Sequence, residues 1–149
     1  MAIKTIIMSL VLICSSSISF ANDYVSGSAR HSGSSAESER SVYEAESNKI
    51  LDNIYAKFDE TYYSGAIKRQ GVALKNYANM ACAVVGYSSG SGGVWPSTYA
   101  LKCETGIAYH YNLSLKKALS CIERLEKQSY IPRGAKMNCV IQVLNTKFF

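Results

Sequence analysis

The chain has 149 residues, with 16 Lys and Arg against 11 Asp and Glu, five Cys, eleven Tyr and one Trp. This length supports one modest domain, because two smaller domains would each lack an adequate core. With 48% apolar and 18% charged residues, the composition excludes a disordered chain, and a single N-terminal apolar run excludes an ordinary integral membrane protein.

Residues 1–21 have the three parts of a secretory signal peptide: a lysine near the start, an apolar stretch over 6–13, and small residues that favour cleavage after Ala21. The apolar stretch is shorter than the about 20 residues that span a bilayer. Cys14 follows the bulky Ile13, whereas lipidation of an exported protein requires a small residue at that place. The sequence predicts export to the periplasm, with no membrane span and no lipid anchor.

Removal of the signal leaves four cysteines, and an even number in an exported chain predicts two disulfides. Four cysteines allow three pairings. Their even spacing favours the local one, Cys82–Cys103 with Cys121–Cys139, in which each bond closes a loop of about 20 residues and contributes about 3 kcal/mol. The close cysteine pairs of a zinc site are missing, so we expect neither a metal nor a cofactor.

The mature chain opens with residues 22–35, which are rich in Ser and Gly and predict a flexible leader. Ser35 is a candidate N-cap for a first helix that ends near Ser64-Gly65. The helical period that predicts it comprises Tyr43, Ser47, Ile50 or Leu51, Ile54, Phe58 and Tyr62.

Two further stripes predict helices on either side of a glycine-rich loop at residues 87–93. The second helix is expected to bury Ile67, Leu74, Tyr77, Ala81 and Val84. The third starts after residues 94–96 with Ser97 as N-cap, and Gly106 or Asn112 is expected to kink it. Its stripe is Tyr99, Cys103, Ile107, Tyr111, Leu115, Ala118, Ile122 and Leu125.

After a break at residues 129–134, periodicity alone does not separate helix from strand in the tail 135–149, for which we favour a short helix. The prediction is therefore an all-α fold. Residues 36–149 form a single domain, a small antiparallel helical bundle of three main helices and a short C-terminal helix, fastened by two disulfides.

Catalytic residues are scarce. His31 lies in the expected leader and His110 among tyrosines, and oxidised cysteines offer no thiolate. Glu44 with Glu46, and Asp59 with Glu60, are one or two residues apart on a helix and do not face each other as an acid–base pair would. The glycine run lacks the Lys and Ser or Thr of a phosphate loop. We therefore expect a binding protein and not an enzyme.

Two surfaces are candidates for binding a protein partner. Residues 36–60 carry a net charge of −4 and residues 61–149 one of +8, so acidic residues such as Glu44 and Glu46 either bind a partner or neutralise the basic remainder. The second surface is the loop, where Trp95, the only tryptophan, accompanies three further candidate residues, Gly92, Gly93 and Tyr99. Clustered basic and stacking residues are missing, so nucleic acid is not an expected partner.

The sequence resembles the LprI-like lysozyme-inhibitor family of exported bacterial proteins over roughly residues 40–120. The resemblance rests on residues 74–82 (LKNYANMAC), 92–103 (GGVWPSTYALKC) and 51–58 (LDNIYAKF). These segments are similar to the family's aromatic-x4-Cys helix end, its Gly-Gly loop followed by Tyr-x3-Cys, and its Leu-Asn-x-x-Tyr helix. The resemblance implies scaffold roles for Cys82, Gly92, Gly93, Tyr99 and Cys103.

The resemblance also implies a function, inhibition of a lysozyme or another peptidoglycan hydrolase by protein–protein contact. Where the family usually has Trp, Arg-Asp and Glu, this chain has Leu74, Ala78-Asn79 and Ala81. Loss of these polar residues would suit a changed partner, so the alternative is a periplasmic immunity protein that neutralises a secreted antibacterial toxin. The sequence leaves the oligomeric state open.

Overall fold

The computed structural model describes residues 2–58, 61–90 and 92–144, and this part of the chain contains four helices and no strand. The helices are α1 (Ala2–Tyr55), α2 (Thr61–Ser88), α3 (Trp95–Leu125) and the short α4 (Ala135–Leu144). The predicted all-α fold of three main helices and a short C-terminal helix is confirmed. Both predicted disulfides, Cys82–Cys103 and Cys121–Cys139, are present.

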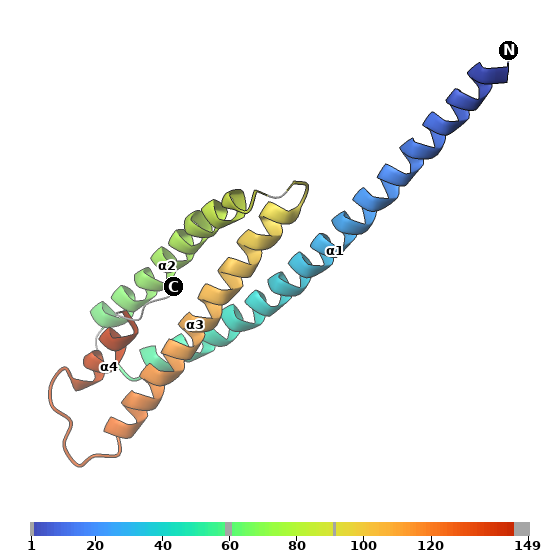
Figure 1. Ribbon diagram of the computed structural model, residues 1–149. Coiled ribbons are helices and arrows are strands. Elements are labelled where there is room, and N and C mark those ends of the chain that lie inside the picture. Colours follow the sequence, from blue (N-terminus) through green and yellow to red (C-terminus); the bar gives the residue numbers. More distant parts are fainter. Residues whose placement is uncertain (1, 59–60, 91, 145–149) are drawn as a thin grey trace.

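Helix α3 is the centre of the fold. The helices α1, α2 and α4 each pack against it and make few contacts with one another. Figure 1 shows α2 and α3 as a hairpin, α1 running beside α3 and on past the end of the hairpin, and α4 folded back at the opposite end. The structure is thus organised around one helix that is covered on several sides.

Helices α1 and α3 are held in register by polar side chains of α3 that bond to the backbone of α1. The three donors and the residues whose carbonyl oxygens accept are Thr98 with Ala29 (2.9 Å), Thr105 with Ala36 (2.8 Å) and Asn112 with Tyr43 (3.4 Å). Donors and acceptors both recur every seven residues in the same chain direction. The two helices therefore run parallel with the heptad spacing of a coiled coil.

The N-terminal half of this contact uses small residues of α1. Ala29, Gly33 and Ala36 are buried, and a Cβ atom on Gly33 would lie 3.3 Å from Thr98 Oγ1. The structure thus differs from the expected flexible leader over residues 22–35 and from the expected cap at Ser35, since α1 passes through both. The Ser and Gly content has a packing explanation: small residues let α3 approach closely, and tertiary contact outweighs weak helix propensity.

The C-terminal half of the contact is apolar. Ile54 of α1, Leu115 and Ile122 of α3, and Val140 of α4 are almost completely buried in one cluster. At its edge, Glu126 accepts hydrogen bonds from Lys57 (2.6 Å) and Lys136 (2.9 Å). These two ammonium groups, Lys57 first, lower the pKa of the Glu126 carboxyl. Together with the bond Cys121–Cys139, this cluster joins α1, α3 and α4.

Helix boundaries depart from the predictions at two places. Helix α1 ends at Tyr55 and not near Ser64-Gly65, because turn hydrogen bonds at residues 57–58 replace the helical pattern. Helix α3 begins at Trp95, with Val94 at the cap position and no side-chain cap, so Ser97 is not the N-cap. The helix is continuous through Gly106 and Asn112, and the kink expected at one of them stays a prediction.

The buried face of α2 also differs from the prediction. Ile67 is buried, but Tyr77 and Val84 are exposed. Ala78, Cys82 and Gly86 instead face α3, and a Cβ atom on Gly86 would lie only 2.4 Å from the Pro96 carbonyl oxygen. Small residues and the Cys82–Cys103 bond therefore orient α2, whereas the apolar period pointed to another face.

A pair of glycine substitutions tests this close approach. Gly86→Ala is expected to destabilise the protein by about 1–3 kcal/mol, because the new methyl group overlaps the backbone of α3. The matched change Gly106→Ala, in the middle of α3 with open space around it, is expected to stabilise by about 0.4–1 kcal/mol. Urea unfolding of the oxidised proteins measures both. Equal effects of the two substitutions would contradict the packing described.

The amide of Asn112 tests the register of α1 and α3. Its Nδ2 atom donates to the Tyr43 carbonyl oxygen and to Ser47 Oγ (3.2 Å), and the side chain is almost completely buried. Asn112→Ala is expected to cost about 1–3 kcal/mol of unfolding free energy, since it leaves buried acceptors unpaired. The exposed Asn76→Ala should change stability by less than about 0.5 kcal/mol. If Asn112→Ala cost no more than this control, the hydrogen bonds of Asn112 would not hold α1 and α3 in register.

Candidate functional site

The tip of the α2–α3 hairpin is formed by the loop predicted to bind a partner. Gly90 and Gly93 have φ angles of 63° and 66°, a left-handed conformation that favours glycine. The loop conformation therefore favours glycine at these two positions. The bond Cys82–Cys103 joins the two helices below the tip and limits how far their ends can separate.

Two aromatic side chains stand on the first turn of α3 at this tip. The ring centroids of Trp95 and Tyr99 are 5.8 Å apart with an interplanar angle of 31°. Tyr99 is exposed, Trp95 is half-buried, and Gly92 has open space around it. The four predicted loop residues, Gly93 included, thus occupy one end of the hairpin.

The acidic residues predicted as a second surface lie elsewhere. Glu44 is 2.9 Å from Lys75 Nζ and 3.7 Å from Arg40 Nε, whereas Glu46 is 2.9 Å from Lys116 Nζ. The hydrogen bond from Lys116 is the main cause that lowers the pKa of Glu46. Lys116 follows Trp95 by 21 residues of α3, about 30 Å along a helix that rises 1.5 Å per residue. The two predicted surfaces do not form one site.

The ion pairs also explain the uneven charge of the chain. Glu44 and Glu46 of α1 form ion pairs with a lysine of α2 and a lysine of α3, respectively. In a third pair the charges are exchanged, because the base, Arg40, is on α1 and the acid, Glu104, is on α3. Acidic side chains of α1 therefore neutralise part of the basic remainder. Of the two interpretations of the acidic segment, these contacts favour the internal one.

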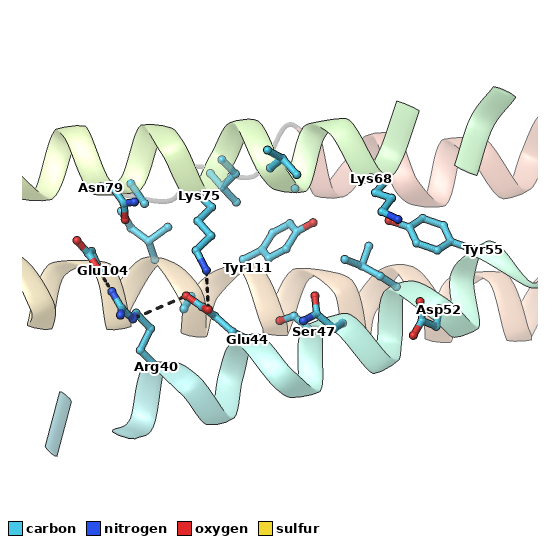
Figure 2. Close-up of a pocket in the computed structure, with 18 of the residues that line it drawn as sticks. Arg40, Glu44, Ser47, Asp52, Tyr55, Lys68, Lys75, Asn79, Glu104 and Tyr111 are labelled. Carbon is cyan, nitrogen blue, oxygen red and sulfur yellow. Dashed lines mark hydrogen bonds and ion pairs between the residues drawn. The ribbon is translucent and has the colours of Figure 1, made fainter. Parts of the chain in front are cut away.

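A groove of about 660 Å³ lies between α1 and α2, with α3 as its floor. It exists because α1 and α2 both pack on α3 but hardly on each other. Its apolar lining includes Leu51 of α1, Leu74 of α2 and Ile107 of α3. Figure 2 shows the ring of Tyr111 projecting into the space between the helices, with the Arg40, Glu44, Lys75 and Glu104 ion pairs at one end and Tyr55 with Lys68 toward the other.

The tyrosines of the groove hold their protons strongly. Burial, and then the neighbouring Tyr55, raises the pKa of Tyr111 to about 12. Burial, and then Asp52, raises the pKa of Tyr55. Both hydroxyl groups are neutral at pH 7 and can donate hydrogen bonds, but they are poor bases. A Cβ atom on Gly71 would lie 3.1 Å from the Tyr111 hydroxyl oxygen, so this glycine gives the phenol its room.

Sequence reasoning missed this groove. As members of helical stripes, Leu74 and Tyr111 were expected in the core, and their position in a groove depends on how three helices pack. Gly65 and Gly71, two glycines inside α2 that both line the groove, are the signal that could have indicated a close approach or a cavity.

Other kinds of site find no support in the described part of the chain. No three His, Cys, Asp or Glu side chains within it could hold a metal ion. No helix in that part is long and apolar enough to cross a membrane. His110 is exposed and contacts the ring of Tyr109 edge-on at 5.3 Å.

Comparison with known proteins gives no relative: no family model, curated protein or solved structure matches the chain.

The buried phenol of Tyr111 predicts a stability change in alkali. Because its pKa is about 10 in the unfolded chain and about 12 in the fold, the stabilisation is present below pH 10 and is lost as the pH rises to 12. The expected loss is about 2–3 kcal/mol of unfolding free energy. Tyr111→Phe should remove most of this dependence and leave the part that comes from Tyr55, whose pKa is also raised. Tyr109→Phe, at an exposed position, should retain it. Urea unfolding at pH 8 and at pH 11.5 measures the change in unfolding free energy. If Tyr111→Phe lost as much stability between these two pH values as the wild type does, the assignment to Tyr111 would be refuted.

Proposed function

We propose that the protein is an exported inhibitor of a lysozyme or another peptidoglycan hydrolase, and that it binds through the hairpin tip. The observation that carries the proposal is the Trp95–Tyr99 pair on a glycine loop fastened by Cys82–Cys103. The resemblance of this segment to the LprI-like family points to the same activity.

The tip is suited to binding for a physical reason. Tryptophan and tyrosine dominate binding hot spots because they bury a large area with few rotatable bonds. A loop closed below by a disulfide also loses less conformational entropy on binding than a free loop. Inhibition would follow if the aromatic pair entered the substrate cleft of the enzyme and excluded the glycan.

Charge gives this inhibitor little help. The chain has a net charge of +5, so it is not attracted to a cationic hydrolase as a whole. Glu44 and Glu46 are engaged by Lys75, Arg40 and Lys116. Affinity would therefore come from burial of aromatic surface at the tip.

A cell-wall lysis assay with the oxidised protein tests the function. The protein is expected to lower lysozyme activity, and Trp95→Ala should weaken inhibition at least about tenfold, the typical loss at a hot spot. Tyr130→Ala, an exposed tyrosine in the connection between α3 and α4, is the matched control and should inhibit like the wild type. No inhibition at a large molar excess would overturn the proposal.

The same assay separates the tip from the acidic surface. The double substitution Glu44→Gln with Glu46→Gln removes both charges and should leave inhibition within about twofold, because surface ion pairs contribute little. If this variant lost inhibition while Trp95→Ala kept it, α1 and not the tip would be the binding surface.

One observation favours the second candidate, an immunity protein against a secreted toxin. Three residues that replace Trp, Arg and Asp of the LprI-like family, Leu74, Ala78 and Asn79, all line the groove between α1 and α2. A groove whose lining differs from that of the LprI-like family is consistent with a different binding partner. Loss of protection on deletion of the gene during a toxin challenge, with no inhibition of lysozyme, would support this candidate over the first.

A further inference from the structure

The outward face of α2 is apolar and exposed. Eleven large apolar side chains in the described part of the chain are exposed, and six of them belong to this helix. They are Val72, Tyr77, Met80, Val84, Val85 and Tyr87. Val72 lines the groove between α1 and α2, whereas Tyr77, Met80, Val84 and Tyr87 share the outward face by their helical spacing. Apolar surface of this kind is uncommon on a monomer and marks an interaction site.

The exposed face has a regular spacing. Ala73, Tyr77, Met80, Val84 and Tyr87 follow one another at intervals of four, three, four and three residues, the spacing of residues that pair one helix with another. Tyr77, Met80, Val84 and Tyr87 are 53%, 75%, 67% and 84% exposed. This seam lies on the side of α2 opposite the residues that pack on α3, and nothing between residues 76 and 88 carries a charge.

The seam is complementary to itself. If two copies of α2 pair antiparallel about Met80, then Met80 meets Met80 of the second copy. At the same register, the small Ala73 lies opposite the large Tyr87. Tyr77 lies opposite the small Ala83 and within one residue, about 1.5 Å along the helix axis, of the smaller Val84. Large side chains thus meet small ones on both sides of a twofold axis, as an isologous contact requires.

We propose that the chain forms a homodimer through this seam, with the two α2 helices antiparallel about Met80. A second copy is the occupant that the observations favour, because the seam matches its own residue sizes and brings no like charges together. The four large exposed side chains of the seam offer a few hundred Å² per copy, which is below the about 800 Å² per partner that is typical of stable complexes. The dimer is therefore expected to dissociate in the micromolar range.

The arrangement adds to the proposed function without depending on it. Antiparallel α2 helices place the two hairpin tips at opposite ends of the dimer, since each tip follows the C-terminal end of its own α2. One dimer would then present two Trp95 loops facing away from each other.

Sedimentation equilibrium over a range of concentrations tests the dimer. The wild type should pass from monomer to dimer, and Met80→Glu should weaken association at least tenfold by placing two like charges in contact. Val42→Glu puts the same charge on an exposed valine of α1 and should not change it. Because both copies are positively charged, added salt should strengthen the dimer. A wild type that stays monomeric at all concentrations, or equal weakening by both variants, would overturn the proposal.

Cysteine cross-linking tests the antiparallel register. Met80→Cys should form a covalent dimer on mild oxidation, because the two side chains meet at the axis. Tyr87→Cys is the matched control on the same seam: its two copies would lie about 21 Å apart along the helices and should not cross-link. Cross-linking of both variants would indicate parallel helices and contradict the model, and so would cross-linking of neither. Circular dichroism of each variant shows that the fold is retained.

Discussion

The contact between α1 and α3 is the constraint on which the rest of the structure depends. Side chains of Thr98, Thr105 and Asn112 reach carbonyl oxygens one heptad apart on α1. Such bonds form only where the helix surfaces nearly touch, which is why Ala29, Gly33 and Ala36 stand opposite them. A shift in register would break all of these bonds. It would leave the buried amide of Asn112 without its acceptors on α1, whereas Thr98 and Thr105 keep carbonyl acceptors on α3 or at its N-cap.

The position of α2 follows from that contact. With one side of α3 taken by α1, the hairpin helix packs on another side, where Gly86 permits a close approach and Cys82–Cys103 fastens it. Helix α2 therefore has a single large neighbour. Its remaining surface borders the groove on one side and exposes the Met80 seam on the other, so both features come from one cause.

The hairpin tip could be predicted from local sequence, because a glycine-rich loop between two cysteines and an aromatic pair one turn apart need no long-range information. The partners of Glu44 and Glu46 could not, since Lys75 and Lys116 are distant in the chain and reach these carboxylates only after the helices pack. Likewise, Leu74 and Tyr111 belong to ordinary apolar stripes. Only the separation of α1 from α2 makes them neighbours in a groove.

The sequence by itself determined the helical class, the three main helices and the two cysteine pairs, because apolar periodicity and cysteine spacing are local properties. For the tail 135–149, periodicity left helix and strand open. Tertiary structure alone decided which side of α2 is buried: burial of Tyr77 and Val84 was expected from their period, but the small residues Ala78, Cys82 and Gly86 pack closer to α3. It also decided that the Ser/Gly segment belongs to α1. Propensity and period describe one helix at a time, whereas burial depends on the shape of the surface that each helix meets.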